Sequence, residues 1–313
     1  MGSRPEAVFS LRRSLAFAAL WGGTEAFNFN PIAFSMKLFR FGASGHEKPG
    51  AVDADGQLRD LSLLIDDWTP RWLAPERLQA LRAIDLRQLP VVPADSRLGV
   101  PVHGIGQFLA IGLNYRQHAQ EANMPLPTEP VVFNKALTCL AGANDDLALP
   151  PDSQTTDWEV ELGIVVGRTT HRVEEAQALD HVAGYVLAND VSERDWQIHH
   201  NGQWVKGKSY PGFGPIGPWL VTADEVPDPQ QIGLTLSVNG QQRQASSTAD
   251  MIFSVAHIVS YLSQFMVLQP GDVILTGTPE GVGMGQRPPV YLRRGDTVEL
   301  SGGILGTQTQ RIL

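Results

Sequence analysis

The chain has 313 residues, of which 42% are hydrophobic and 18% charged, a composition typical of a globular protein with one large or two moderate domains. Its formal net charge of −9 argues against nucleic acid as a partner, because phosphate binding needs a basic face. The single cysteine, Cys139, excludes an intrachain disulfide and is expected to be a small buried hydrophobe.

Residues 1–35 differ in composition from the rest of the chain. Two arginines precede the apolar run LAFAALWGG, a pattern that faintly suggests a secretory or twin-arginine signal. The run is too short to cross a membrane, and FNFNPIAFS follows it instead of a small-residue cleavage site. Met36 then opens MKLFRFG as the natural start of a folded domain. We therefore favour a poorly ordered extension over residues 1–35 and a cytoplasmic protein with no membrane partner, with a signal peptide as the alternative.

The segment from residue 36 to residue 100 has the signals of a small β-rich unit. AVDADGQLRDLS reads as two strands around an Asp-Gly turn, and PERLQALRAI is helix-like. LRQLPVVPADSRLGVPV is rich in proline and has no clear period, which is typical of a linker. We predict a small N-terminal domain and linker over residues 36–100, without catalytic residues, and a catalytic domain over residues 101–313.

Two apolar runs near the start of the second segment end in polar residues. FLAIGLNY is consistent with a buried strand, and RQHAQE follows it. In a helix, His118 and Glu121 would be neighbours, three residues apart, and such a pair can serve as a general base with an orienting partner. The alternative is an exposed polar helix face. VVFNKALT places Lys135 at the end of the other apolar run.

The strongest candidate site lies in DWEVELGIVVG and YVLANDVSERDWQ. Glu159 and Glu161 are two residues apart, so on a strand they project from the same face, and Asp190 ends the second apolar run. Three carboxylates without a Cys or His in either strand form an oxygen-only site that suits Mg²⁺ or Mn²⁺ and argues against zinc. The alternative is that Glu159 and Glu161 form the solvated face of an amphipathic strand.

The remaining chain alternates helix, strand and turn signals. VEEAQALDHVAG predicts a helix stopped by Gly184, and LTLSVNGQQRQ predicts a hairpin with a turn at Asn239 and Gly240. GDVILTGTPEGVGMG reads as a strand that enters a glycine-rich loop containing Thr278, which we expect to close over a small ligand. SVAHIVSYLSQF predicts an amphipathic helix whose apolar face comprises Val255, Ile258, Val259, Leu262 and Phe265.

Five motifs in this order resemble the fumarylacetoacetate hydrolase family over roughly residues 105–313: IGLNYRQHAQE, DWEVELGIVVG, YVLANDVSERDWQ, KGKSYPGFGPIGP and GDVILTGTPEGVG. The resemblance implies an α+β, mostly β fold, in which a mixed β-roll catalytic domain follows a small N-terminal β-rich domain. It also implies a homodimer or a higher homo-oligomer.

The same resemblance assigns roles to residues that match its motifs. It implies that Glu159, Glu161 and Asp190 bind Mg²⁺ or Mn²⁺. The implied catalytic residues are His118 and Glu121, a dyad on a lid that activates water, and Lys208, which adds positive charge near the developing oxyanion. The implied substrate-binding residues are Lys135, Arg194, Gln197, Tyr210 and Thr278. Ala136 departs from the proline usual after the family's lysine, which leaves the role of Lys135 less certain.

The implied chemistry is hydrolytic cleavage of a carbon–carbon bond in a 2,4-diketo acid. GQWVKGKSYPGFGPIGPWLVTADEVPDP most resembles a branch that acts on 2,4-diketo-3-deoxy sugar acids. Its type substrate, 2,4-diketo-3-deoxy-L-rhamnonate, gives pyruvate and L-lactate. Ureidoglycolate lyase, acylpyruvase and oxaloacetate decarboxylase activities are alternatives on the same site. A non-catalytic, metal-stabilised binding protein is disfavoured, because His118 and Glu121 are both present.

Overall fold

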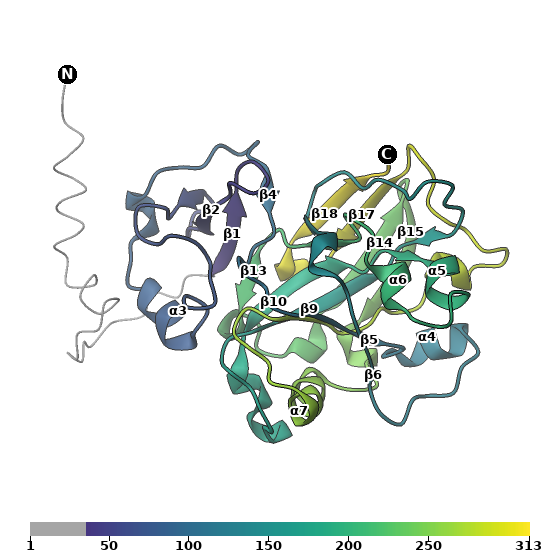
Figure 1. The fold of residues 1–313 in the computed structure, drawn as a ribbon. Coiled ribbons are helices and arrows are strands. Elements are labelled where there is room, and N and C mark those ends of the chain that lie inside the picture. Colours follow the sequence, from purple (N-terminus) through teal and green to yellow (C-terminus); the bar gives the residue numbers. More distant parts are fainter. Residues whose placement is uncertain (1–35) are drawn as a thin grey trace.

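The computed structural model describes residues 36–313, so the expected N-terminal extension lies outside the described residues. A mixed sheet of twelve strands runs through the protein (Figure 1). Nine of its strands follow the order β3–β2–β1–β13–β10–β9–β16–β5–β6, and β4, β7 and β12 attach beside them. The strands are β1 (Lys37–Phe41), β2 (Lys48–Val52), β3 (Leu58–Asp60), β4 (Leu98–Gly99), β5 (Phe108–Gly112), β6 (Val131–Asn134), β7 (Leu140–Gly142), β9 (Val160–Val166), β10 (Val182–Asn189), β12 (Gly214–Ile216), β13 (Leu220–Thr222) and β16 (Val273–Leu275).

Two smaller sheets, five short α-helices and eight 3-10 helices complete the described fold. The four-stranded sheet has the order β15 (Gln241–Ser247), β14 (Gly233–Val238), β17 (Thr297–Ser301) and β18 (Thr307–Arg311), and a two-stranded sheet pairs β8 (Thr156–Asp157) with β11 (Ser192–Glu193). The helices are α3 (Pro75–Leu81), α4 (Arg116–Glu121), α5 (Arg194–Ile198), α6 (Val205–Lys208) and α7 (Val255–Phe265). The predicted α+β, mostly β class is confirmed.

The N-terminal segment joins the main sheet. Strand β1 pairs antiparallel with β13, and β2 pairs with the other edge of β1, so the sheet continues from one segment into the other (Figure 1). Arg97 reinforces the junction with contacts of 2.9 Å to Glu47 and 2.6 Å to Asp145. The predicted domain boundary near residue 100 stays a prediction, and the two segments share one hydrophobic core.

Strands β9 and β10 form the centre of the sheet. Every residue of both strands is buried, as expected for continuous apolar runs covered on both faces. Each fully buried Val, Leu or Ile side chain contributes about 1.5–3 kcal/mol to folding, so these strands are firmly held. They pair antiparallel, with Ala188 opposite Glu161 and Asn189 opposite Val160. This register sets where the polar residues at the strand ends meet.

The helix predicted to end at Gly184 is wrong in type and in boundary. A 3-10 helix covers Glu175–His181, and Gly184 lies inside β10. A Cβ at Gly184 would lie 2.1 Å from the carbonyl oxygen of Val221, so the glycine permits the close approach of β13. The short-range sequence pattern resembled a helix stop, whereas the neighbouring strand is the reason for the glycine.

Helix α7 confirms most of its predicted apolar face. The Ser254 hydroxyl accepts a hydrogen bond from the His257 amide (3.1 Å) and caps the first turn. Four of the five predicted positions are buried: Val255, Ile258, Val259 and Leu262. Phe265 is 68% exposed, so that assignment is wrong. It lies at the edge of the apolar stripe, in the last turn, and packs edge-on against Tyr261 at 5.0 Å.

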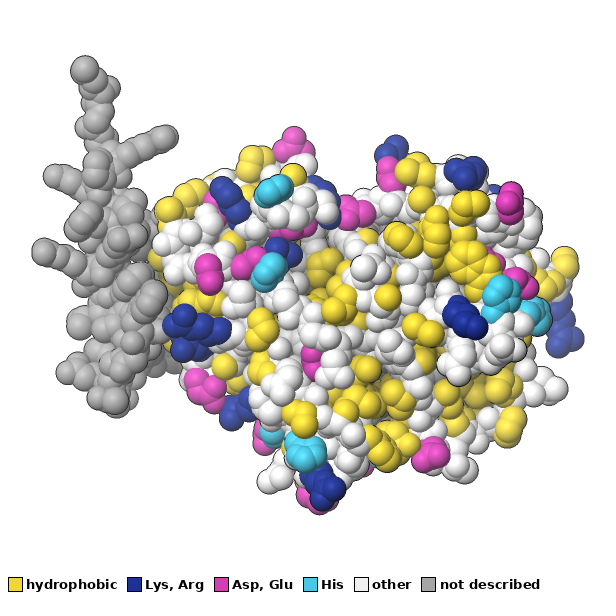
Figure 2. Space-filling model, in the orientation of Figure 1, with side chains coloured by type: hydrophobic (Ala, Val, Ile, Leu, Met, Phe, Trp, Pro, Cys, Tyr) yellow, Lys and Arg dark blue, Asp and Glu magenta, His cyan; other side chains and the backbone are white. Residues whose placement is uncertain are grey.

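Charged side chains of both signs are mixed on the face seen in Figure 2. There, Lys and Arg side chains are interspersed with Asp and Glu side chains and with many hydrophobic ones. Such a mixture creates no extended field of one sign on this face. Within the described chain, every helix falls short of the length and apolarity that a membrane span requires.

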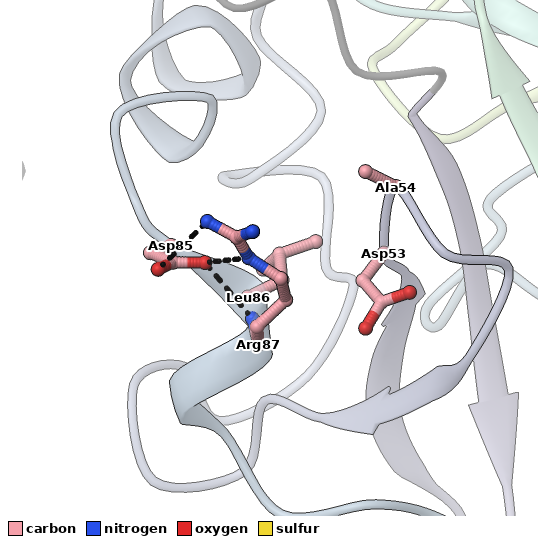
Figure 3. A pocket seen from close by; sticks show the side chains of 5 residues that line it. All are labelled: Asp53, Ala54, Asp85, Leu86 and Arg87. Atoms are coloured by element: carbon pink, nitrogen blue, oxygen red, sulfur yellow. Dashed lines mark hydrogen bonds and ion pairs between the residues drawn. The ribbon is translucent and has the colours of Figure 1, made fainter.

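A small pocket lies in the N-terminal segment (Figure 3). Its lining residues are Asp53, Ala54, Asp85, Leu86 and Arg87, and Asp85 accepts a hydrogen bond from the Arg87 side chain at 2.9 Å. Its volume of about 10 Å³ is the room that a single water molecule needs. It is therefore too small for an organic substrate.

Candidate active site

Three carboxylates meet where β9 and β10 lie side by side. Glu159 immediately precedes β9, Glu161 is its second residue, and Asp190 immediately follows β10. The Asp190 amide donates to the Glu159 carbonyl at 2.9 Å, which extends the ladder beyond the strand ends. One carboxylate oxygen from each of the three residues lies within 4.8 Å of the others. All three side chains are buried, so the solvated-strand alternative is wrong and the predicted cluster exists.

Two lysines balance part of this negative charge. The Lys208 ammonium donates to Glu159 Oε2 at 2.7 Å and to Asp190 Oδ2 at 2.8 Å. The Lys135 ammonium donates to Asp190 Oδ1 at 2.5 Å and also to the carbonyl oxygen of Lys208. Both lysines are buried, and buried charges persist only when they are paired in this way.

Ala136, the residue after Lys135, makes a hydrogen bond that a proline at this position could not make. The Ala136 amide donates to Ser209 Oγ at 2.9 Å, and proline has no N–H for such a bond. The bond ties the turn that carries Lys135 to the segment that carries Lys208. Ala136 thus keeps the two lysines together despite its departure from the family pattern.

The carboxylates of Glu159 and Glu161 are in opposite electrostatic situations. Burial would raise the pKa of Glu159, but Lys208, Arg194 and, to a smaller extent, His118 outweigh it and lower that pKa to about 2. Burial also raises the pKa of Glu161, and here the neighbouring Asp190 and Glu159 carboxylates raise it further, well above its usual range. Among the described residues Glu161 therefore has no ion pair of its own, and the attraction of Lys208, which pairs with Glu159 and Asp190, does not offset the two carboxylates.

These residues fit a divalent cation. The donor set contains oxygen atoms only, which suits a hard ion such as Mg²⁺ or Mn²⁺. The side chain of Glu161 accepts a hydrogen bond from the neutral Gly277 amide at 2.8 Å and faces two further carboxylates. A divalent ion held by Glu159, Glu161 and Asp190 would supply the positive charge that Glu161 needs in order to stay ionised.

The predicted dyad forms on the short helix α4. His118 Nδ1 lies 3.0 Å from Glu121 Oε2, and both side chains are mostly buried, with 12% and 18% exposed. The contribution of His118 to the pKa of Glu159 shows that the dyad lies within electrostatic range of the carboxylate cluster. A histidine that holds a carboxylate beside a charged cluster is suited to move a proton to or from a bound molecule.

A glycine-rich loop, residues 276–285, connects the dyad to the cluster. It follows β16, and two of its backbone amides bind carboxylates of the site. The Gly277 amide donates to Glu161 Oε2 at 2.8 Å, and the Gly281 amide donates to Glu121 Oε1 at 2.9 Å. Backbone amides are fixed donors, so this loop links the Glu121 carboxylate to that of Glu161.

Asp157 fixes the far end of the same loop, a role that the sequence did not reveal. Its carboxylate accepts hydrogen bonds from the Gly283 amide (2.7 Å) and the Met284 amide (3.0 Å). It also accepts from Arg194 Nε at 2.8 Å, and Arg194 Nη1 lies 2.7 Å from Glu159 Oε1. The position of Asp157, two residues before Glu159 in DWEVE, placed it on the same side of the strand and was the available signal.

The predicted substrate-binding residues already have partners within the protein. Arg194 Nη1 donates to Gln197 Oε1 at 3.0 Å, and both side chains are buried. The Thr278 hydroxyl donates to the Val160 carbonyl at 2.9 Å. Tyr210 is half-buried and packs edge-on against Phe213, with ring centroids 5.3 Å apart. Substrate contacts from these residues stay predictions.

Tyr115, immediately before α4, was also not singled out. Its ring is completely buried, and its hydroxyl has no hydrogen-bond partner among the described residues. Burial raises the pKa of Tyr115 well above its usual range, and the nearby charge of Glu161 raises it further. The hydroxyl therefore stays protonated close to the carboxylate cluster. The motif NYRQH contained the residue, but nothing in its spacing distinguished it from a core tyrosine.

Comparisons with known proteins show the family and the fold of this chain. The family model described as fumarylacetoacetate (FAA) hydrolase C-terminal matches residues 107–313. A Burkholderia ambifaria protein named as an inferred hydrolase is 55% identical over 276 residues, which cover 88% of this chain and 98% of that protein. The structure of a fumarylacetoacetate hydrolase from Exiguobacterium antarcticum has a TM-score of 0.79 at 35% identity and covers 89% of this chain and 99% of its own.

Two further solved structures indicate the range of chemistry among similar proteins. A maleylpyruvate hydrolase from Sphingobium sp. SYK-6, in complex with manganese(II) and pyruvate, has a TM-score of 0.75 at 30% identity, covering 89% of this chain and 99% of that one. A 2-hydroxyhepta-2,4-diene-1,7-dioate isomerase from Mycobacterium marinum has a TM-score of 0.70 at 32% identity, covering 89% and 98%. Hydrolases and isomerases thus share this fold.

Proposed function

Because the chain belongs to the fumarylacetoacetate hydrolase family, we propose that it is a metal-dependent hydrolase that cleaves a carbon–carbon bond of a 2,4-diketo acid. The proposed substrate is 2,4-diketo-3-deoxy-L-rhamnonate, which would give pyruvate and L-lactate in sugar-acid catabolism. The manganese- and pyruvate-bound relative supports a substrate with a 2-oxo acid end. We also propose a cytoplasmic homodimer or higher homo-oligomer.

The observation that carries this proposal is the His118–Glu121 contact of 3.0 Å beside the carboxylate cluster. Hydrolysis needs a base that takes a proton from water, whereas decarboxylation of oxaloacetate needs little more than an electron sink. With one oxygen held by His118 and the other by the Gly281 amide, Glu121 is oriented to accept that proton. The dyad therefore favours hydrolysis over simple decarboxylation.

The other residues divide the remaining work. A bound Mg²⁺ or Mn²⁺ would supply positive charge for the 2-oxo acid end of the substrate. Water, deprotonated by Glu121, adds to the C4 carbonyl. The C3–C4 bond then breaks and its electron pair stays on C3, which takes up the proton held by Glu121 to give pyruvate, while C4 becomes the carboxyl carbon of L-lactate. Two of the three N–H groups of Lys208 contact Glu159 and Asp190, which leaves the third for the oxyanion that forms on C4.

The test is a substrate screen with purified protein and either Mg²⁺ or Mn²⁺. Diketo-deoxy sugar acids, acylpyruvates, oxaloacetate, ureidoglycolate and 2-hydroxyhepta-2,4-diene-1,7-dioate are compared, and pyruvate release and isomer formation are measured. We expect the 2,4-diketo acids to have the highest kcat/KM and chelation to remove the activity. Faster turnover of the dienedioate, or full activity after thorough removal of metal, would contradict the proposal.

A further inference from the structure

The position of the Glu121 carboxylate depends on what surrounds it at the end of α4. Glu121 is the last residue of this helix, so one helix turn alone does not fix its side chain. His118 Nδ1 contacts one carboxylate oxygen at 3.0 Å, and the Gly281 amide donates to the other at 2.9 Å. Together the two contacts hold the carboxylate between His118 and the glycine-rich loop.

The loop leaves room for that carboxylate at Gly285. A Cβ built on Gly285 would lie 2.4 Å from Cδ and 2.6 Å from Oε1 of Glu121, far inside van der Waals contact. The φ angle of Gly285 is outside the left-handed region, so its backbone conformation suits other residues. Glycine is required here because Glu121 occupies the space, and not because of the chain conformation.

The other glycines of the loop differ in this respect. A Cβ at Gly281 would lie 2.0 Å from the carbonyl oxygen of Arg243, and one at Gly283 would lie 1.9 Å from that of Val290. Substitution at those positions would displace backbone. At Gly285, the nearest atoms all belong to the flexible end of the Glu121 side chain. An added methyl group would therefore move Glu121 and leave the loop in place.

We propose that Gly285 is a positioning residue for the reaction, because its missing side chain allows Glu121 to reach the place where it accepts a proton from water. The inference rests on the proposed role of Glu121 as the base. Displacement of a catalytic group by about 1 Å typically costs on the order of 10²-fold in rate. Gly285 would thus influence turnover without contacting the metal ligands.

The experiment begins with Gly285→Ala. We expect kcat for the diketo acid to fall by roughly 10–100-fold, with KM changed less than twofold, because the base moves while the carboxylate cluster does not. The affinity for Mn²⁺, measured by titration calorimetry, should change less than twofold. Gly233→Ala is the matched control, because a Cβ there meets nothing within 4 Å and its φ is ordinary; it should behave as wild type.

A double-variant series tests whether the effect passes through Glu121. Glu121→Asp shortens the side chain by one methylene, so Gly285→Ala should cost less in that background than in wild type. In a Glu121→Ala background the space is free, and Gly285→Ala should change neither kcat nor the melting temperature. The melting temperature keeps the test informative if Gly285→Ala alone folds poorly, because the defect should then disappear when Glu121 is truncated.

The outcomes separate this inference from the proposed function. Wild-type activity in Gly285→Ala, together with an inactive Glu121→Ala enzyme, overturns the inference and leaves the base role intact. Equal losses from Gly285→Ala in the wild-type and Glu121→Ala backgrounds also overturn it, because the loop would then act independently of Glu121. An active Glu121→Ala enzyme instead overturns the base role on which the inference rests.

Discussion

The two halves of the candidate site are built in different ways. The carboxylate cluster is part of the central strands β9 and β10, whose residues are all buried and whose register places Ala188 opposite Glu161. The dyad lies on α4, which has only six residues, and Glu121 reaches the rest of the site through one amide of a loop. The comparison suggests a rigid half that binds and a more adjustable half that reacts.

The difference follows from how each element is stabilised. A six-residue helix is unstable alone, so tertiary contacts must hold α4. Arg116 Nη1 donates to the carbonyls of Asp250 (3.0 Å) and Met251 (2.7 Å), and Asp250 accepts from the Gln117 amide at 3.0 Å. These are a few partly exposed hydrogen bonds, whereas β9 and β10 have ladders and buried side chains. Elements with fewer buried contacts open at lower free energy.

The largest effect should come from the rigid half, through Glu161→Gln. This change removes the charge but keeps the volume, so we expect Mn²⁺ affinity to fall by more than the roughly 10–100-fold that outer contacts of a metal site typically contribute. Activity should disappear with it. The metal-free protein should be at least as stable as wild type, because two neighbouring carboxylates repel Glu161. Calorimetric Mn²⁺ titration and thermal unfolding measure both, with the exposed Glu299→Gln as control.

The second-largest loss of activity should come from substitutions in the adjustable half, the dyad on α4. His118→Ala and Glu121→Ala should each lower kcat for diketo-acid cleavage by ~10²–10⁴-fold, the typical cost of a lost general base. Mn²⁺ affinity should change little, since neither residue is a proposed ligand. Any oxaloacetate decarboxylation should fall less. Near-normal hydrolysis by Glu121→Ala would remove the distinction between a binding half and a reacting half.

A third prediction addresses the connection between the halves. Asp157→Asn keeps the shape but weakens the hold on Arg194, which contacts Glu159 at 2.7 Å, so Mn²⁺ affinity should fall by roughly 10–100-fold. Asp195→Asn, on α5, is the matched control, because this side chain is exposed and its ion-pair partners among residues 36–313 are surface histidines. Unchanged affinity in Asp157→Asn would mean that β9 positions Glu159 without help from Arg194.

The features of the site that depend on strand pattern could be predicted from the sequence. Alternation along β9 placed Glu159 and Glu161 on one face, and the apolar run before Asp190 identified β10. The turn at Asn239 and Gly240, with φ of 52° and 73°, also follows its sequence signal. In each case the residues that determine the feature are close together in the chain.

The features that depend on distant parts of the chain could not be predicted. Glu121 is bonded to an amide 160 residues away, and Asp157 to amides 126 and 127 residues away. The opposite pKa shifts of Glu159 and Glu161 arise because Lys208 and Arg194 pair directly with Glu159, whereas at Glu161 burial and the Asp190 and Glu159 carboxylates outweigh the attraction of Lys208. Gly184 shows the same limit, since the neighbour that requires it is Val221 on another strand.

The smallest expected effect is a pH-dependent change in stability that comes from Cys139, and it tests whether the binding half is rigid. The side chain is fully buried beside the lysine turn, and burial raises the pKa of its thiol to about 11. In the unfolded chain the thiol has its ordinary pKa near 9, so the folded protein holds the proton more tightly. The associated stability is complete below pH 9 and is lost as the pH rises from about 9 to about 11, by about 2–3 kcal/mol in all.

Urea unfolding of wild type and Cys139→Ala at pH 8, 9 and 10 measures the contribution of the thiol to the free energy of unfolding. The cavity left by alanine lowers stability by the same amount at each pH, so any change in the difference between the two proteins belongs to the thiol. We expect the wild type to lose its relative advantage only above pH 9, and a neutral thiol reagent to label Cys139 at pH 8 only after unfolding. Rapid labelling of the folded protein would mean that the buried segment after Lys135 opens readily. That result would contradict the distinction between a rigid half and an adjustable half of the site.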